Sequence, residues 1–202
     1  MKTKLSLLIV TICLAASHAY SQAEFAIGIK AGPNFASLDT KASAGENYKS
    51  RTGFHGGAFA LIKLSKIGIQ PEIIFSQQGS KVEFNGADIE SNYNYMNVPI
   101  ILKLYTIAGI NIQAGPQFGF ITKAEETFDY NGDTTTEDIK NQLKGSDISL
   151  GLGLGWDLPF GLTIDGRYNL GLSKINDAPD RPEAKNQVWQ FSVGYKLFKF
   201  GN

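Results

Sequence analysis

The chain has 202 residues, which is enough for one domain with a sizeable core or for one closed barrel. Its 19 lysine and arginine residues balance its 19 aspartate and glutamate residues, so it lacks the basic excess of a typical nucleic-acid-binding protein. The single cysteine, Cys13, excludes an intramolecular disulfide and a cysteine-based metal site.

Residues 1–21 have the pattern of a signal peptide. Two lysines are followed by a largely apolar run over 5–16 and then by small residues around Ser21. The run is shorter than the roughly 20 residues that a membrane-spanning helix needs, which argues against a membrane anchor. We expect cleavage after Ser21, loss of Cys13 with the peptide, and a mature domain over 22–202. Export without disulfides is typical of a bacterial envelope protein rather than a small secreted scaffold.

The mature part of the chain alternates apolar and polar residues with a period of two, which is typical of β-strands. Eight segments show this alternation, and each is close to the roughly 10 residues that a tilted strand needs to cross a bilayer. They cover about 25–35, 53–63, 67–77, 94–104, 109–120, 147–158, 161–172 and 188–198. No helical pattern of useful length lies between them, so the predicted class is all-β.

The clearest alternation is "ISLGLGLGWDL" over 148–158. One row consists of Leu150, Leu152, Leu154 and Trp156, and the other of Gly151, Gly153, Gly155 and Asp157. The G-x-G-x-G spacing differs from the G-x-G-x-x-G of a dinucleotide site, and no helix start follows it. We therefore interpret the glycines as the small face of a strand and the leucines as its apolar face.

The connections between the segments alternate in length. Long polar stretches cover 36–52, 78–93, 121–146 and 173–187, and short ones cover 64–66, 105–108 and about 159–161. Long loops on one side, tight turns on the other and an even number of strands are typical of outer-membrane barrels. The sequence therefore predicts an eight-stranded antiparallel up-and-down transmembrane β-barrel.

Alternation by itself leaves open whether the apolar face meets lipid or a soluble core. Glycines are frequent on the polar face, and they suit the inside of an eight-stranded barrel, whose bore is only wide enough for side chains to fill. We therefore place the apolar row against lipid. Charged residues of both signs fall on the polar face, and we expect them to neutralise one another in the lumen. They are Lys30, Glu72, Lys103, Asp165, Arg167 and Lys196.

Aromatic residues near the ends of the last three strands are candidates for the girdles at the two membrane interfaces. They are Trp156, Phe160, Tyr168, Trp189 and Tyr195. Prolines inside the predicted strands need bulges or strand ends, because a closed barrel has no edge where a missing N–H is harmless. They are Pro33, Pro71, Pro99 and Pro116. The matching pentamers "AGPNF" and "AGPQF", at 31–35 and 114–118, indicate a shared local kink or a duplicated four-strand unit.

Four stretches resemble a known family: "FAIGIKAGPNFASL", "GFHGGAFALIKL", "IGIQPEIIFSQQGSK" and "YMNVPIILKLY". They are similar to the small outer-membrane β-barrels of Bacteroidota-type bacteria, often labelled PorT-like, whose fold resembles the OmpA and OmpX barrels. Such barrels commonly end on an aromatic residue in the lipid-facing row. Here that row ends at Leu197, whereas Phe198 and Phe200 have the other parity. Either the assembly signal is imperfect or the register slips at the end.

These observations favour a non-enzymatic outer-membrane barrel with a filled lumen. It would serve the envelope through long outer loops, by structural support, adhesion or assistance to a secretion complex. The expected partners are outer-membrane lipids, the barrel assembly machinery and envelope or secretion-complex proteins, without nucleic acid, metal or cofactor. One alternative is a lipid-modifying enzyme with a rim site at His55, although no spacing ties a nucleophile to it. Another is a small-solute pore, which a filled bore disfavours.

The acidic stretch "DYNGDTTTED" begins like a calcium-binding loop. Its sixth position is Thr134 instead of glycine and its twelfth is Lys140 instead of glutamate, so it does not match an EF-hand. Loose binding of a divalent ion by the acidic residues of this loop remains an alternative to a simply solvated loop. They are Glu125, Glu126, Asp129, Asp133, Glu137 and Asp138.

Overall fold

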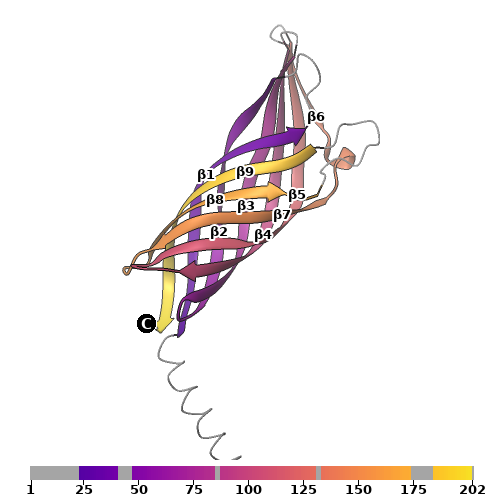
Figure 1. The fold of residues 1–202 in the computed structure, drawn as a ribbon. Coiled ribbons are helices and arrows are strands. Elements are labelled where there is room, and N and C mark those ends of the chain that lie inside the picture. The colour runs from indigo at the N-terminus through magenta and orange to yellow at the C-terminus, as the bar shows by residue number, and fades with distance from the viewer. Residues whose placement is uncertain (1–22, 41–46, 85–86, 131–132, 174–183, 202) are drawn as a thin grey trace, which may run out of the picture.

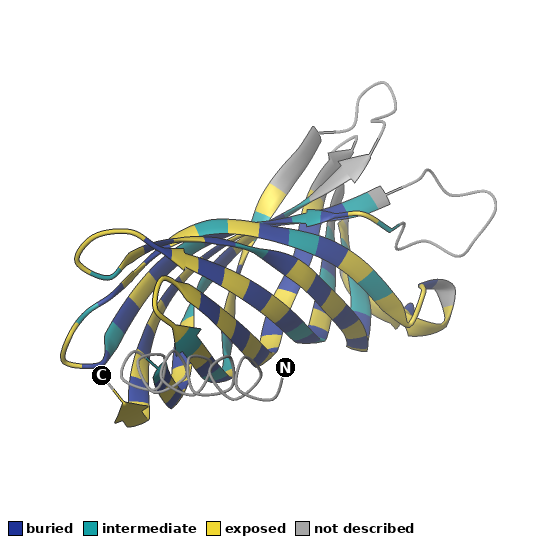
Figure 2. Ribbon diagram, turned by 60° about the horizontal axis from the view of Figure 1, so that its bottom comes forward, coloured by how far each residue is buried: buried dark blue, intermediate teal, exposed yellow. Residues whose placement is uncertain are grey.

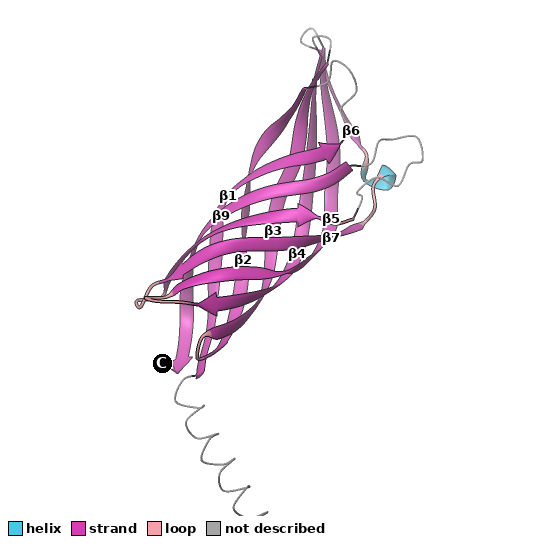
Figure 3. Cartoon of the chain, in the orientation of Figure 1, coloured by secondary structure: helices cyan, strands magenta, loops and turns pink. Residues whose placement is uncertain are grey.

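The computed structural model describes residues 23–40, 47–84, 87–130, 133–173 and 184–201, which form a single β-sheet with one short 3-10 helix (Figure 3). The strands are β1 (Ala23–Thr40), β2 (Asn47–Leu64), β3 (Ile67–Phe84), β4 (Ala87–Tyr105), β5 (Ile110–Tyr130), β6 (Asp133–Asp138), β7 (Ser146–Asp157), β8 (Leu162–Gly171) and β9 (Ala184–Gly201), and the helix is η1 (Lys140–Gln142). Within these residues, no helix is long and apolar enough to cross a membrane. The predicted signal peptide, 1–21, lies outside the described residues.

The sheet closes into a ring of antiparallel strands (Figure 1). Its order is β1, β2, β3, β4, β5, β7, β8 and β9, and β9 pairs again with β1. The remaining strand, β6, pairs only with the outer part of β5. Consecutive strands of the ring are neighbours throughout, so the prediction of an all-β, eight-stranded, antiparallel up-and-down barrel is confirmed.

Burial alternates along the strands of the ring (Figure 2), with apolar residues outside and mostly polar residues inside. The inner face also holds a few apolar side chains, such as Phe59, Leu61 and Ile101. On β7, Leu152 and Leu154 are 46% and 63% exposed, whereas the glycines that alternate with them, Gly151, Gly153 and Gly155, lie on the side of the bore. A Cβ atom at Gly151 would lie 3.1 Å from Arg167 Cδ, and one at Gly155 would lie 2.3 Å from Gln113 Nε2. The glycines of this strand therefore leave space for large polar side chains from neighbouring strands.

The outer parts of the barrel differ from the prediction. Strands β2 to β5 have 18 to 21 residues, against 12 in β7 and 10 in β8, and in Figure 1 they rise beyond the rest of the ring. The predicted loop at 78–93 is a hairpin of β3 and β4, and most of 121–146 belongs to β5, β6, η1 and the start of β7. These segments lack the alternation because both of their faces lie outside the membrane. We call this extension the outer sheet.

A small apolar cluster lies where the outer sheet meets the barrel. Its buried members are Tyr93, Tyr95, Ile121, Ala124, Ile139 and Leu143. The backbone N–H of Ile139 donates to Ala124 O at 3.1 Å, which holds the η1 segment against β5. This cluster fixes the end of the β6 hairpin on the barrel.

The prolines cause interruptions of the ladder without bulges, so the expectation of bulges or strand ends is wrong at these positions. Pro33 pairs with β2, but on the β9 side the ladder skips from Ala31 to Asn34 with its register unchanged. Pro71, Pro99 and Pro116 lie in gaps of the same kind. In both pentamers a glycine before the proline admits a carbonyl of the neighbouring strand. A Cβ atom would lie 1.8 Å from Phe191 O at Gly32 and 2.0 Å from Ile100 O at Gly115.

The end of β9 contains a register shift. Gly28 pairs with Lys196 but Ile27 pairs with Phe198, which leaves Leu197 as an extra residue. Phe198 and Phe200 are then 61% and 63% exposed on the outer face, and the ring of Phe200 stacks on Phe25 with 6.4 Å between centroids. Of the two alternatives for the chain end, the register slip is the one observed.

Candidate functional site

The centre of the bore holds a group of four charged side chains, two of each sign, which we call the central cluster. Lys30 Nζ lies 2.9 Å from Asp165 Oδ1 and 3.6 Å from Glu72 Oε1. Arg167 donates to both carboxylate oxygens of Glu72, at 2.9 and 3.1 Å, and to Gln113 Oε1 at 3.0 Å. The cluster is electrically neutral and hydrogen-bonded, which is what buried charges require.

The position of the central cluster follows from the order of the strands. Glu72 is on β3 and Arg167 is on β8, and three strands separate these two on either side of the ring. Their contact therefore crosses the full width of the bore. Arg167 pairs with Gly153 on β7. A Cβ atom built at Gly153 would lie 3.3 Å from the Cβ atom of Arg167. Glycine at this position thus leaves room for the guanidinium to extend inward.

A second group, the turn-side cluster, lies at the strand ends joined by the short turns. Asp157 Oδ1 accepts from Lys103 Nζ at 3.0 Å, and its Oδ2 accepts from Tyr105 Oη at 2.8 Å. Lys196 Nζ lies 3.2 Å from Asp157 Oδ2 and donates to Glu24 Oε1 at 2.6 Å. Lys103 on β4 and Lys196 on β9 belong to opposite strands of the ring, so this group also crosses the bore.

All six charged residues that the sequence indicated as lumenal are buried, and they divide between the two clusters. Two further members, Glu24 and Asp157, were not among the predicted residues. Asp157 has the inward parity of the glycine row, and Glu24 has the parity of Lys30, but the first predicted strand began one residue too late to include Glu24. Asp157 already stood on the inward row of its predicted strand, and extending the first strand by one residue would have found Glu24.

Beyond the central cluster, toward the outer end, most of the described inward side chains are uncharged amides, hydroxyls and one imidazole, and the part-buried Asp147 adds a carboxyl group. The uncharged side chains include Asn34, His55, Ser76, Asn97, Asn169, Gln190 and Ser192. His55 Nε2 lies 2.8 Å from Ser192 Oγ, and Gly32, which pairs with His55, leaves the space between them open. Among the described residues, Nδ1 of His55 has no hydrogen-bond partner. The imidazole is therefore held at one nitrogen only.

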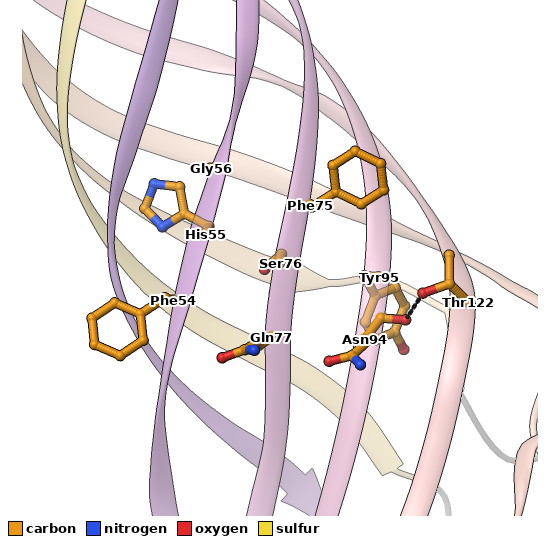
Figure 4. A pocket seen from close by; sticks show the side chains of 9 residues that line it. All are labelled: Phe54, His55, Gly56, Phe75, Ser76, Gln77, Asn94, Tyr95 and Thr122. Atoms are coloured by element: carbon orange, nitrogen blue, oxygen red, sulfur yellow. Dashed lines mark hydrogen bonds between the residues drawn. The ribbon is translucent and has the colours of Figure 1, made fainter.

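His55 also lines a pocket of about 380 Å³ at the outer part of β2, β3 and β4 (Figure 4). The other lining residues are Phe54, Gly56, Phe75, Ser76, Gln77, Asn94, Tyr95 and Thr122. In this set, residues of the inner face and residues of the outer face lie side by side. The pocket is therefore associated with the wall of the barrel rather than with the bore alone.

The five predicted girdle aromatics form two groups. Tyr168 and Trp189 are cross-strand partners with 4.9 Å between their ring centroids. Trp156, Phe160 and Tyr195 lie on the side of the short turns: Trp156 Nε1 donates to Ala108 O at 2.9 Å, and Tyr195 pairs with the first residue of β8. Trp156, Phe160, Trp189 and Tyr195 are 46–65% exposed and Tyr168 is half-buried, so all five lie on the outer face.

The acidic residues of the predicted third loop lie along the β5–β6 hairpin, where Glu125 pairs with Asp138 and Glu126 with Glu137. Within the described residues, no three histidine, cysteine or acidic side chains converge on one point that could hold a metal ion. Successive residues of a strand point to opposite faces, which spreads these carboxylates over both sides of the hairpin.

Several solved structures share this fold. The attachment invasion locus protein Ail of Yersinia pestis has a TM-score of 0.51 and 16% identity, with 89% of this chain and 99% of that chain covered. Neisserial surface protein A has a TM-score of 0.52 and 13% identity, covering 85% and 97%. Ail in complex with the heparin analogue sucrose octasulfate has a TM-score of 0.50 and 18% identity, covering 89% and 99%. At these identities the likeness shows the fold alone. No curated protein matches the sequence.

A family model described as "Outer membrane protein beta-barrel domain" matches residues 17–177, which is most of the chain. The match agrees with the closed ring, the apolar outer face and the polar lumen. Together these findings assign the location as well as the fold: the chain belongs to the outer membrane protein beta-barrel domain family and is a protein of the bacterial outer membrane.

Proposed function

We propose that this protein is a non-enzymatic, non-conducting barrel that anchors its outer sheet in the outer membrane and serves the envelope through contacts made there. The observation that carries the proposal is the contact of Arg167 with Glu72 between opposite strands of the ring. The turn-side cluster crosses the bore a second time. An ion that entered the lumen would have to break both sets of buried, charge-assisted contacts.

Conductance tests the closed bore. Purified protein, refolded as a monomer in planar bilayers, should show no stable channel events. Replacing both crossing pairs, Arg167–Glu72 and Lys103–Asp157, with glycine should produce measurable conductance, because one cation and one anion are then removed from each cluster and the net charge of the bore is unchanged. Steady porin-sized channels from the unaltered protein would contradict the proposal.

The outer sheet is the part available for contact with other molecules. Its β5–β6 hairpin is polar, and the described side chains of β6 are all exposed. Adhesion, structural support or assistance to a secretion complex would each use this surface. One protein of the same fold is named for attachment and invasion, which makes adhesion the first function to test.

Shortening the hairpin tests this role. Glu125 and Asp138 are cross-strand partners, so residues 126–137 can be replaced by an Asn-Gly turn without stretching the backbone. The shortened protein should fold in the membrane but fail to restore attachment or envelope integrity to a strain that lacks the gene. A shortened protein that restores both would contradict the proposal, because the barrel alone would then suffice.

A lipid-modifying enzyme is the second candidate, and the contact between His55 and Ser192 is the observation that favours it. A hydrolytic triad needs a third group that orients the histidine through its other nitrogen, and among the described residues none bonds to Nδ1 of His55. We therefore expect His55→Ala to leave the lipid composition of the host unchanged. A folded His55→Ala barrel that abolishes a lipid modification would replace the first proposal with this one.

Several finer assignments belong to the same proposal. The four stretches that resemble PorT-like barrels support a place among small Bacteroidota-type proteins, and the N-terminal pattern supports a signal peptide cleaved after Ser21. The exposed Phe198 and Phe200 restore an aromatic outer row at the chain end, which supports recognition by the barrel assembly machinery. The aromatic groups at the two ends support the girdle role.

A further inference from the structure

The outer face of the barrel changes from apolar to polar at one level on three neighbouring strands. On β3 the exposed row passes from Phe75 to Gln77, on β4 from Met96 to Asn94, and on β5 from Phe120 to Thr122. The first residue of each pair is apolar and the second is polar. This level therefore marks the outer boundary of the membrane around β3, β4 and β5.

At the same level the ladder between β2 and β3 is interrupted. Ser50 pairs with Ser80 and His55 with Ser76, and the register shifts between these two pairs. The carbonyl oxygens of Gln77 and Gln78 accept from side chains instead, from Asn34 Nδ2 at 3.1 Å and from Arg51 Nη1 at 3.2 Å. The wall of the barrel thus loses its continuous backbone pairing where the membrane ends.

The 380 Å³ pocket of Figure 4 coincides with this interruption. Phe54 and Phe75, which are 66% and 62% exposed, flank it on the lipid side, and Gly56 between them carries no side chain. Gln77, Asn94 and Thr122 border it on the polar side, and His55 is one of its inner residues. Apolar and polar lining residues therefore follow the direction from hydrocarbon to headgroup.

We propose that this pocket binds one lipid of the outer leaflet, with an acyl chain along Phe54 and Phe75 and an uncharged hydrogen-bonding group of its head against Gln77, Asn94 and Thr122. The apolar flank is continuous with the lipid-facing belt, so the occupant comes from the bilayer itself.

The lining residues also define the chemistry of the head. None of the nine is lysine, arginine, aspartate or glutamate, so the pocket has no side chain suited to a phosphate. The amide and hydroxyl groups of Gln77, Asn94 and Thr122 match the hydroxyl, amide or ester group of a lipid near its acyl chain. The cations that border the pocket are already engaged. Arg51 is bound to Glu90 at 3.0 Å and Lys123 to Glu125 at 2.8 Å, and Lys140 Nζ donates to the backbone oxygen of Thr122 at 3.1 Å.

Photo-crosslinking tests the proposal. The full chain is refolded into phosphatidylcholine vesicles that carry a trace of ceramide with a diazirine in its acyl chain, and crosslinked peptides are mapped after irradiation. We expect the ceramide probe to label the peptides that contain Phe54 and Phe75 about 2- to 10-fold more than the rest of the lipid-facing belt. This ratio corresponds to one or two additional hydrogen bonds to the lipid head. A phosphatidylglycerol probe with the same acyl diazirine should show no enrichment.

Gly56→Leu fills the pocket and should abolish the enrichment. A Cβ atom at position 56 would have its nearest neighbours at 3.7 and 3.8 Å, so the variant has room to fold. Gly166→Leu is the matched control, because a Cβ there would also meet only ordinary contacts, at 3.4 Å, in a separate outer-face groove. It should keep the enrichment, whereas Gln77→Leu should reduce the preference for ceramide.

Three results would overturn the proposal. Uniform labelling of the belt by ceramide would mean that only ordinary surrounding lipid is present. Enrichment of phosphatidylglycerol equal to or above that of ceramide would show that the head chemistry is wrong. Enrichment that survives Gly56→Leu would place the lipid elsewhere. None of these results bears on whether the bore conducts or the outer sheet adheres, so the proposed function is tested separately.

Discussion

Arg167 on β8 and Glu72 on β3 join opposite sides of the barrel by two contacts, at 2.9 and 3.1 Å. Their side chains are 2% and 1% exposed, so the pair is shielded from solvent and from salt. A buried pair of this kind adds little net stability compared with apolar side chains of the same size, but removing one partner leaves the other uncompensated. The pair therefore predicts a strongly unequal response to single and double substitutions.

Arg167→Met should lower the free energy of unfolding by about 3–5 kcal/mol, because Glu72 and Asp165 would then share the single cation Lys30. Replacing Arg167 and Glu72 together with methionine should recover most of this loss. Urea titration of the protein refolded in vesicles measures both values. Arg51→Met is the control, since Arg51 pairs with the part-exposed Glu90 and should cost about 0–1 kcal/mol. Equal losses for the two single variants would show that the central pair is not shielded.

The barrel itself could be predicted from the sequence because a membrane wall imposes a strict alternation. Leu152 and Gly153 are adjacent in the sequence, but their surroundings are opposite. Leu152 faces lipid, whereas Gly153 faces the crowded bore. The charges of the lumen follow the same parity, which is why Lys30 and Arg167 could be assigned before their partners were known. Where one face is fixed by lipid, the period of the strand determines the other face.

The outer sheet could not be predicted in this way. Lys81 and Glu90 are cross-strand partners with 2.7 Å between Nζ and Oε2, yet neither belongs to an apolar alternation. Outside the membrane both faces of a strand contact water, so the amino-acid composition of such a strand is the same as that of a polar loop. The contact of His55 with Ser192 was hidden for another reason: the residues are 137 positions apart, and the contact depends on the space left by Gly32.

Gly32→Ala should prevent the barrel from folding, whereas Gly56→Ala should be tolerated. A Cβ atom at Gly32 would lie 1.8 Å from Phe191 O, a backbone atom that cannot move without opening the β1–β9 pairing. At Gly56 the nearest neighbours would be 3.7 and 3.8 Å away. The heat-modifiable mobility of folded barrels in SDS gels measures both variants. Efficient folding of Gly32→Ala would mean that the close approach beside Pro33 is not required.

The outer sheet should lose local stability in acid. The hydrogen bond from Lys81, together with that from Arg51, holds the pKa of Glu90 below its usual value of about 4.3. A carboxylate whose pKa is lowered by folding adds stability above its unfolded pKa, and this contribution is lost as the pH falls through the folded pKa. Hydrogen exchange, corrected for intrinsic rates, should therefore show protection of residues 80–91 decreasing below about pH 4.

Glu90→Gln should remove most of this pH dependence and leave the strands within the membrane unaffected. The variant already lacks the carboxylate at neutral pH, so its outer sheet should exchange there much as the unaltered protein does in acid. If Glu90→Gln and the unaltered protein respond to acid identically, other carboxylates control the outer sheet.

The lipid-facing row of β7 gives the most direct test of the membrane assignment. Leu152 is 46% exposed on the outer face, and Ser149 on the same strand is buried in the bore at 6%. Ser149 is a better inner site than Gly153, where a Cβ atom would lie 2.5 Å from Gly166 O. In a Cys13→Ser background, a nitroxide on Leu152→Cys should be reached far better by oxygen than by a water-soluble nickel chelate. A nitroxide on Ser149→Cys should be poorly reached by both.

The loss of stability caused by an arginine at position 152 provides a second test of the same surface. Leu152→Arg should cost about 2–4 kcal/mol if the residue lies near the bilayer midplane, and less if it lies near an interface. The loss by itself would also occur in a soluble core, so the access measurement decides. If oxygen does not reach the nitroxide at position 152 in a folded, reconstituted sample, the leucines of β7 face protein. The assignment of the apolar face to lipid would then be wrong for every strand of the ring.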